Sequence, residues 1–118
     1  MFNFEKLDVW QKAIVFADSI YSETRNFPIE ERFGLTNQMR RAGVSISSNI
    51  AEGSSRMSQA DFARFLEIGT GSLFEVVSQS FIAKRQEFLS QESFSSIYEN
   101  AEELSRMLSG LRKSLFPR

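Results

Sequence analysis

The stretch QMRRAGVSISSNIAEG, residues 38–53, decides the fold of this chain. Six residues that begin just before this stretch are spaced alternately four and three positions apart: Leu35, Met39, Ala42, Ile46, Asn49 and Gly53. That spacing is typical of the packed face of an α-helix. One position round the helix runs a polar stripe, made of Gln38, Arg41, Ser45, Ser48 and Glu52. The stretch therefore predicts a helix whose polar face meets a specific surface.

The residue types that are missing exclude several classes of chemistry. The 118 residues include no cysteine and no histidine. Disulfides, thiolate nucleophiles and cysteine metal sites are therefore excluded, and the commonest general base is absent too. We expect a protein that is not an enzyme and that holds no cofactor and no metal ion.

Charge and hydropathy limit the partners and the location. The formal net charge is −1, which argues against a strongly electrostatic nucleic-acid binder. No apolar run approaches the roughly 18 residues of a membrane span. The N-terminus lacks a basic stretch followed by an apolar core, so it does not resemble a secretory signal. We expect a cytoplasmic protein with no membrane association.

Turn and capping residues divide the chain into four expected helices, at about residues 4–25, 29–52, 58–88 and 91–115, within one domain covering 1–118. Pro28 is placed near the start of the second helix, and Gly53 is placed as a C-cap. Ser58, followed by Asp61, is an N-cap signature for the third helix. Either Ser90 or Gln91 begins the fourth. Four helices with short loops favour an all-α, up-down-up-down antiparallel four-helix bundle.

Two helices carry more apolar residues than one bundle core can use. The first has one stripe of Leu7, Trp10, Ile14, Ala17 and Tyr21 and another of Val9, Ala13, Phe16 and Ile20. Together they cover about 180° of the helix, against the roughly 100° needed for one buried face. In the third helix, Phe74 and Phe81 widen the main stripe. A contiguous exposed apolar strip usually marks an interface, so we expect a homo-oligomer. The candidate interface residues are Val9, Ala13, Phe16, Ile20, Phe74 and Phe81, and loose assignment of boundary positions is the alternative explanation.

The third helix also contains two glycines, Gly69 and Gly71, which cost about 1 kcal/mol each relative to alanine. Close approach of a neighbouring helix is the expected reason. A phosphate-binding loop is the alternative, but the segment has neither the lysine nor the strand-loop-helix context of one.

Several motifs resemble one known family. They are Phe4-x-x-Leu7-x-Val9-Trp10, Phe27-Pro28, Phe33-Gly34-Leu35, Gln38-Met39-Arg40-Arg41-Ala42, Ser45-Ile46-x-Ser48-Asn49-Ile50-Ala51-Glu52-Gly53 and Gly71-Ser72-Leu73-x-Glu75. On these motifs the chain resembles the bacterial 23S rRNA intervening-sequence proteins, also called four helix bundle proteins. The resemblance implies an antiparallel bundle that assembles into a ring-like homopentamer. Most members have no assigned activity. A related branch, the accessory proteins of diversity-generating retroelements, binds a reverse transcriptase and nucleic acid through a basic pentamer surface, and the near-neutral charge of this chain departs from that branch.

Two functional hypotheses follow. In the first, the chain is a non-enzymatic oligomeric scaffold or adaptor for a protein partner. In the second, it is an accessory protein that binds RNA or DNA weakly through an arginine-rich region, Arg32, Arg40, Arg41 and Arg56. Alternatively, these arginines form ion pairs between subunits or within a helix, for example with Glu30, Glu31, Asp61 or Glu67.

Within the polar stripe, Asn49 and Glu52 are interpreted structurally. We expect Asn49 to fix helix register, as a buried asparagine does in coiled coils. Glu52 lies near a helix C-terminus, where the helix dipole disfavours a carboxylate, and is expected to pair with Arg41 or another arginine.

Overall fold

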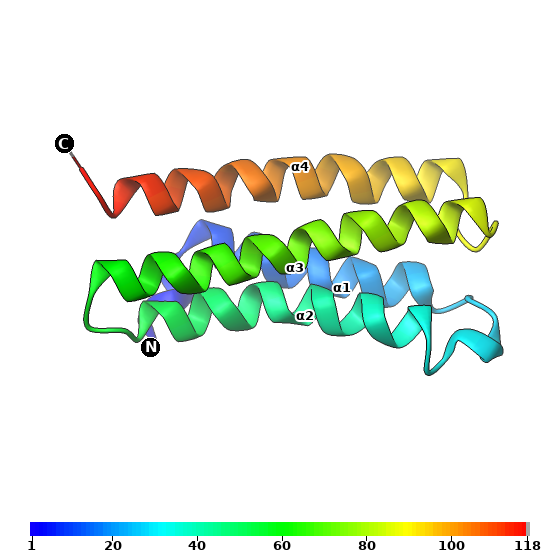
Figure 1. Ribbon diagram of the computed structural model, residues 1–118, viewed down its shortest axis with the longest axis horizontal. Coiled ribbons are helices and arrows are strands. Elements are labelled where there is room, and N and C mark those ends of the chain that lie inside the picture. The colour runs from blue at the N-terminus through cyan, green and yellow to red at the C-terminus, as the bar shows by residue number, and fades with distance from the viewer. Residues whose placement is uncertain (118) are drawn as a thin grey trace.

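Four long helices make up most of the computed structural model, which describes residues 1–117. They are α1 (Asp8–Thr24), α2 (Leu35–Ser54), α3 (Gln59–Arg85) and α4 (Gln91–Ser114), with short 3-10 helices η1 (Asn3–Lys6) and η2 (Ile29–Glu31). Successive helices run in opposite directions and lie along a common axis (Figure 1), within a rod of 46 × 23 × 21 Å. The prediction of an all-α, antiparallel four-helix bundle is confirmed.

The helix ends follow the capping chemistry in two of the expected places. Ser58 Oγ accepts a hydrogen bond from the backbone N–H of Asp61 at 3.1 Å, as predicted. Ser90 Oγ accepts one from the backbone N–H of Ser93 at 3.0 Å, so Ser90 rather than Gln91 caps α4. An N-cap side chain satisfies one of the backbone donors that a helix start leaves free.

Three boundaries differ from the expectation. The first helix starts at Asp8 rather than near residue 4, because Asn3–Lys6 forms a separate 3-10 helix. The second helix starts at Leu35 rather than near residue 29, because Ile29–Glu31 forms a separate 3-10 turn after Pro28. The third helix ends at Arg85 rather than near residue 88. Glu87 has φ 65°, in the left-handed region that an α-helix cannot contain.

The helices form a four-sided bundle. Contacts run between consecutive helices and between α1 and α4, and the most extensive packing joins α2 to α3. The pair α1 and α2 therefore makes one side of the bundle, and the pair α3 and α4 makes the opposite side. This arrangement decides which helix faces can meet a partner.

Glycines allow α2 and α3 to approach closely. A Cβ at Gly69 would lie 3.6 Å from Asn49 Cβ and 3.6 Å from the Ile46 carbonyl oxygen, which is ordinary van der Waals contact. Helix α2 is therefore close to α3 at Gly69, as expected, but the space there would accept a Cβ, so the approach does not require a glycine. At Gly71 an added Cβ would meet nothing within 4 Å, so within this chain Gly71 has no such packing reason.

Gly53 has a packing role rather than the expected capping role. Helix α2 continues to Ser54, and Gly53 does not have a positive φ. A Cβ at Gly53 would lie only 2.8 Å from Phe62 Cδ1 and 2.8 Å from Phe65 Cβ. Gly53 therefore leaves space for the first turns of α3, and its assignment as a C-cap was wrong.

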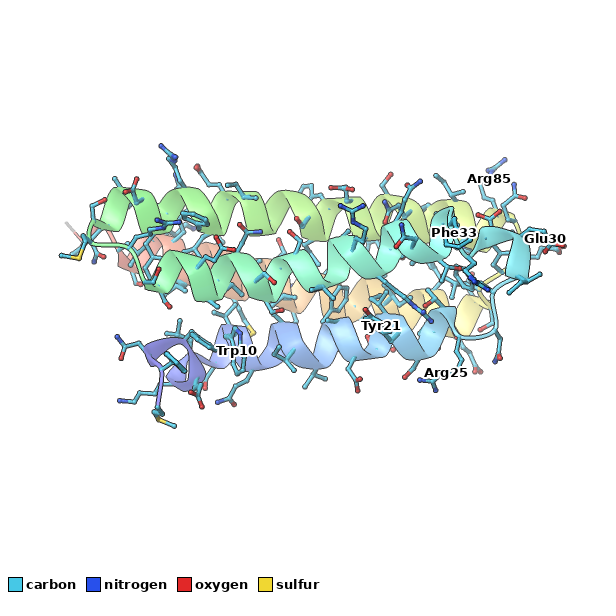
Figure 2. The ribbon with its side chains drawn as sticks, turned by 90° about the horizontal axis from the view of Figure 1, so that it is seen from below. Trp10, Tyr21, Arg25, Glu30, Phe33 and Arg85 are labelled. Carbon is cyan, nitrogen blue, oxygen red and sulfur yellow. The ribbon has the colours of Figure 1, made fainter. Side chains whose placement is uncertain are left out.

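The exposed fractions of the side chains show which apolar stripe of α1 faces inward. Val9, Ala13, Phe16 and Ile20 are at most 5% exposed. Because α1 contacts both α2 and α4, the stripe between these neighbours is enclosed. These four side chains belong to the core of the chain, which corrects their expected place at a subunit interface. The other stripe is enclosed only in part: Ala17 is 8% exposed, whereas Ile14 is 42% and Tyr21 41% exposed. Trp10 is partly buried, and Figure 2 shows Trp10 and Tyr21 along α1.

Candidate functional site

Part of the polar stripe of α2 is used in the packing of α2 against α3. The hydroxyl groups of Ser45 and Ser72 are 2.9 Å apart. Asn49 Nδ2 donates to the backbone oxygen of Ser45 at 2.8 Å and to Ser45 Oγ at 3.0 Å. Gln79 Nε2 lies 3.5 Å from Gln38 Oε1. These bonds give the stripe a structural use, and those of the Asn49 amide stay within α2.

The rest of the stripe faces outward on α2. Arg41, Ser48 and Glu52 are exposed. Together with Tyr21 and Val44 they line a shallow hollow of about 610 Å³. The expected pairing of Glu52 with an arginine is not found, since the two ion pairs within residues 1–117 are Lys12–Glu103 and Arg112–Glu67. The charges of Arg41 and Glu52 therefore remain at the surface.

Three of the four candidate arginines stack on aromatic rings. The guanidinium carbon lies 5.0 Å from the Phe33 ring centre for Arg32, 4.7 Å from that of Tyr21 for Arg40, and 4.5 Å from that of Phe65 for Arg56. Such cation–π contacts contribute about 0.5–1 kcal/mol at exposed sites. Arg40 is also fixed by hydrogen bonds, from Nε to Thr24 Oγ1 at 2.9 Å and from Nη2 to the backbone oxygen of Tyr21 at 3.4 Å.

Two of the four expected acidic partners of these arginines have other partners. Glu67 pairs with Arg112 at 2.9 Å, and Glu31 Oε1 accepts a hydrogen bond from the backbone N–H of Leu35 at 3.0 Å. Within residues 1–117 of one chain none of the four arginines forms an ion pair, and ion pairs between subunits stay a prediction.

The four arginines do not form one patch. Arg32 precedes α2 and Arg56 follows it, so they lie at opposite ends of the bundle (Figure 1). Phe33, on which Arg32 stacks, lies at the same end as Glu30 and Arg85 (Figure 2). Only Arg40 and Arg41 share a surface, the hollow on α2.

The largest feature of the opposite side is an apolar groove of about 610 Å³ between α3 and α4. We call it the α3–α4 groove; its lining includes Leu73, Phe74, Val77, Phe81, Tyr98, Ala101, Glu102 and Arg106. Phe74 is 64%, Phe81 47% and Tyr98 38% exposed. The sequence predicts Phe74 and Phe81 as surface candidates but does not predict Tyr98. The available signal was its position next to Ile97 on the apolar seam of α4.

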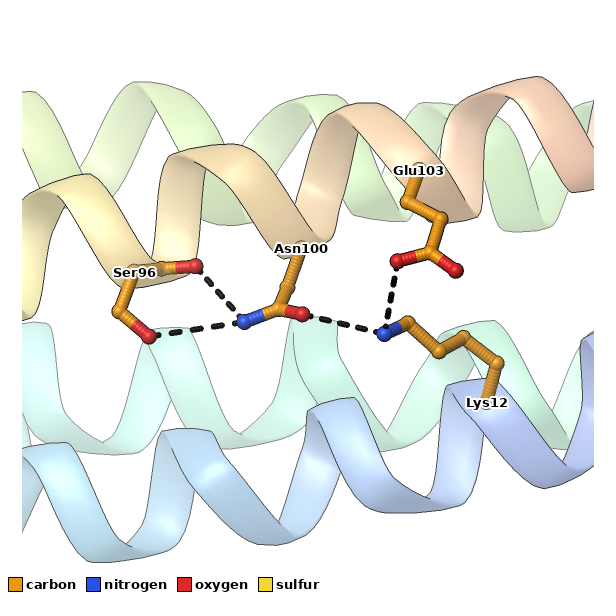
Figure 3. A network of polar contacts seen from close by, with 4 residues as sticks. All are labelled: Lys12, Ser96, Asn100 and Glu103. Carbon is orange, nitrogen blue, oxygen red and sulfur yellow. Dashed lines mark hydrogen bonds and ion pairs between the residues drawn. The ribbon is translucent and has the colours of Figure 1, made fainter.

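A second polar cluster ties α1 to α4 (Figure 3). Lys12 Nζ donates to Asn100 Oδ1 at 3.0 Å and pairs with Glu103 Oε2 at 3.1 Å. Asn100 Nδ2 donates to the backbone oxygen of Ser96 at 2.8 Å. The cluster fixes α4 beside α1 and leaves the α3–α4 groove open on its other flank.

Within the described residues, no group of three or more acidic side chains is placed to hold a metal ion, and none of the four long helices could cross a membrane.

The profile of the family described as 23S rRNA-intervening sequence protein matches residues 5–110 of this chain. The chain belongs to this family. A solved structure of a related protein is similar to this chain over most of its length. It is a protein of unknown function of the S23 ribosomal protein family from Bacteroides thetaiotaomicron VPI-5482. It is 29% identical, with a TM-score of 0.79, over 89% of this chain and 98% of that one. No curated protein matches this sequence.

Two of the motif stretches contact each other in the structure. The stretches Ser45–Gly53 and Gly71–Glu75, which are far apart in the sequence, meet at the α2–α3 packing through Ser45 and Ser72. The motifs of this 23S rRNA-intervening sequence protein are thus used first for packing, while Arg41, Ser48 and Glu52 remain exposed.

Proposed function

We propose that this protein is a non-enzymatic, homo-oligomeric scaffold that acts by presenting repeated surfaces to a protein partner. The observation that carries the proposal is the open α3–α4 groove, where Phe74 and Phe81 stay exposed although both are large and apolar. Exposing a contiguous aromatic patch to water costs a monomer free energy, and such patches usually mark interaction sites. Covering the groove with a second copy removes that cost.

The family relationship adds an expected form of assembly, a ring-like homopentamer. A ring repeats each surface of the chain at a fixed spacing. If a protein partner contacts several copies at once, weak individual contacts add up to useful avidity. The lack of cysteine and histidine in the sequence supports a role in assembly rather than in catalysis.

Light scattering on a sizing column tests this proposal. We expect a mass several times the 13.5 kDa of one chain, and five times that mass for the pentamer. Phe74→Asp places a charge in the groove and should lower the mass. Ile29→Asp is the matched control, because Ile29 is 71% exposed but lies in η2, away from the groove. A monomeric wild-type protein contradicts the proposal.

Binding of RNA or DNA is a second candidate. It is favoured by Arg40 and Arg41, which share the surface hollow of α2 and have no carboxylate partner within residues 1–117. Phosphate binding weakens steeply as salt rises. A generic RNA pool at low salt should then shift the elution position, and the double variant Arg40→Glu, Arg41→Glu should abolish the shift. Arg64→Glu, which changes an exposed arginine of α3, is the control. Binding that survives both higher salt and the double variant contradicts this mechanism.

A further inference from the structure

A buried hydroxyl group holds the side chain of Arg40 in place. Arg40 Nε donates to Thr24 Oγ1 at 2.9 Å, and Thr24 is only 2% exposed. The Thr24 hydroxyl group in turn donates to the backbone oxygen of Ile20 at 2.7 Å. The guanidinium carbon of Arg40 also lies 4.7 Å from the centre of the Tyr21 ring. A free arginine side chain has many rotamers, so these contacts preorganise one positive charge at the surface.

This preorganised guanidinium group has no anionic partner in the part of the chain that the structure describes. The ion pairs there join Lys12 to Glu103 and Arg112 to Glu67. The bonds from Arg40 to Thr24 and to the Tyr21 backbone use only some of its N–H donors. The remaining donors belong to a planar fork that matches the two oxygens of a carboxylate. Arg40 is therefore placed to receive an anion from another molecule.

The surface around Arg40 has opposite charges at its two ends. We call the hollow of about 610 Å³ on this helix the α2 hollow. Arg40 and Arg41 line one end of it, and Glu52 lines the other. Arg41 and Glu52 are about three turns apart, which puts them on the same helix face and about 16 Å apart along the axis. A ligand that fills the hollow meets positive charge at one end and negative charge at the other.

The middle of the α2 hollow is partly apolar. Val44 is 40% and Tyr21 41% exposed, and both line the hollow. Asn49, nearer to Glu52, uses its Nδ2 in hydrogen bonds to Ser45, which leaves its Oδ1 as an acceptor. An acceptor beside a carboxylate favours a ligand group that donates N–H bonds. The matching ligand therefore has an anion, an apolar group and a cation in that order.

A nucleic-acid backbone fits this pattern poorly. Negative charge along its whole length would be attracted by Arg40 and Arg41 but repelled by Glu52. Arg32 and Arg56 lie at opposite ends of the bundle, so they do not extend the pair into a track of positive charge (Figure 1). A polypeptide can carry all three kinds of side chain, and about five residues of extended chain, at about 3.3 Å each, span the hollow.

We propose that the α2 hollow binds an extended segment of a protein partner that carries a carboxylate, then an apolar side chain, then a basic side chain. Arg40 and Arg41 hold the carboxylate, Val44 contacts the apolar side chain, and Glu52 pairs with the basic one. The inference rests on the proposed function, since it names the surface that the scaffold presents and the chemistry of its partner. The residues lining the hollow come from α1 and α2, so the hollow shares none with the α3–α4 groove.

Fluorescence anisotropy with a labelled peptide tests the proposal on the full chain. The probe is a short end-capped peptide with an aspartate and a lysine about five residues apart and a leucine midway between them. Arg40→Gln should weaken binding about tenfold. A probe with asparagine in place of aspartate should bind this variant and the wild type equally. Arg64→Gln, which changes an exposed arginine of α3, should keep the wild-type affinity. A wild-type protein that does not bind the probe, or an unchanged affinity in Arg40→Gln, overturns the proposal.

A change at Thr24 tests whether the fixed position of Arg40 matters. Thr24→Val keeps the shape of the side chain but removes the hydroxyl group that holds Arg40, and it should weaken binding about threefold. Thr24 itself is too buried to touch the peptide. Thr36→Val is the matched control, because Thr36 is 8% exposed and its hydroxyl group has no hydrogen-bond partner within residues 1–117. Circular dichroism checks that both variants fold. Equal affinities overturn the preorganised site, and if Thr24→Val does not fold, Arg40→Gln still decides.

Glu52 distinguishes a peptide from a nucleic acid, because its removal acts on the two in opposite directions. Glu52→Gln should weaken binding of the probe up to about fivefold, since a basic side chain loses its partner. The same variant should bind a polyuridine RNA more tightly than the wild type, since a repulsion is removed. If the RNA displaces the probe and the affinity for the probe is unchanged in Glu52→Gln, the occupant is a nucleic acid and the proposal is wrong.

Light scattering on the same samples separates this inference from the proposed function. A wild-type protein that assembles but does not bind the probe overturns this inference alone. A monomeric wild-type protein that binds the probe, and loses binding in Arg40→Gln, overturns the homo-oligomeric scaffold and supports the binding site.

Discussion

The hydroxyl groups of Ser45 and Ser72 lie 2.9 Å apart between α2 and α3. Ser72 is 8% exposed, and Ser45 Oγ also receives a hydrogen bond from Asn49 Nδ2 at 3.0 Å. A buried hydroxyl group without a partner is costly, so the Ser72 hydroxyl depends on Ser45. The relationship joins two of the sequence motifs of the chain into one packed, polar contact.

Removing the hydroxyl group of Ser72 should weaken that contact. We expect Ser72→Ala to lower the free energy of unfolding by about 0.5–1 kcal/mol relative to Ser48→Ala. Ser48 is exposed on α2, and its variant shares the gain in helix propensity that alanine brings. Urea unfolding followed by circular dichroism measures both variants, and equal stabilities would show that the Ser45–Ser72 bond contributes nothing.

Two glycines should respond in opposite ways to the same change. At Gly53 an added Cβ would lie 2.8 Å from atoms of Phe62 and Phe65, whereas at Gly71 it would meet nothing. Gly71→Ala should stabilise the chain by up to about 1 kcal/mol through helix propensity. Gly53→Ala gains the same propensity but overpacks the contact, which typically costs about 1–3 kcal/mol, so a net loss is expected. Thermal unfolding of both variants checks this, and a more stable Gly53→Ala protein would contradict the packing role.

Aromatic truncation in α1 should show which side of the helix is enclosed. Phe16 is 2% exposed, so Phe16→Ala should cost about 3–5 kcal/mol. Trp10 is only partly buried and packs edge-on against Phe4, with ring centres 4.8 Å apart. Trp10→Ala should therefore cost clearly less, below about 3 kcal/mol. Chemical denaturation gives both values, and the reverse order would place the wrong stripe in the core.

The contact of Lys12 with Glu103 should contribute little by itself. The two side chains are 23% and 52% exposed and 3.1 Å apart. Exposed ion pairs are typically worth about 0.2–1 kcal/mol and weaken with salt. A double-mutant cycle with Lys12→Met and Glu103→Gln should give a coupling energy in that range at low salt and a smaller one at high salt. A coupling energy that is the same at low and high salt would mean that the hydrogen bond from Lys12 to Asn100 dominates instead.

Helix periodicity and capping chemistry were sufficient to predict the bundle, because both act within a few residues of each other. Ser58 caps α3 through its own third helical residue, Asp61, and the seam of α4 needs no knowledge of its neighbours. The first helix was harder. Its two stripes are both apolar, so the sequence alone could not choose between Phe16 and Trp10 as the core residue. The choice depends on the positions of α2 and α4.

The candidate surface was predicted only in part for the same reason. Phe74 and Phe81 were identified because they exceed what one buried stripe needs, and both are exposed. Val9 and Ile20 were assigned to the same surface from their helical positions, yet they are enclosed. The arginines from Arg32 to Arg56 are close in sequence, but a helix of 20 residues separates the first from the last.

By itself the sequence determined the all-α class, the number of helices, most of their ends and the family, since periodicity, caps and motifs are local properties of the chain. The tertiary structure decided which stripe of α1 is buried, why Gly53 must lack a side chain, and that Arg40 rests on Tyr21 while Glu67 pairs with Arg112. Those outcomes depend on segments that are distant in the sequence. Burial and pairing are fixed only when the helices pack, because each helix surface is defined by the neighbour that covers it.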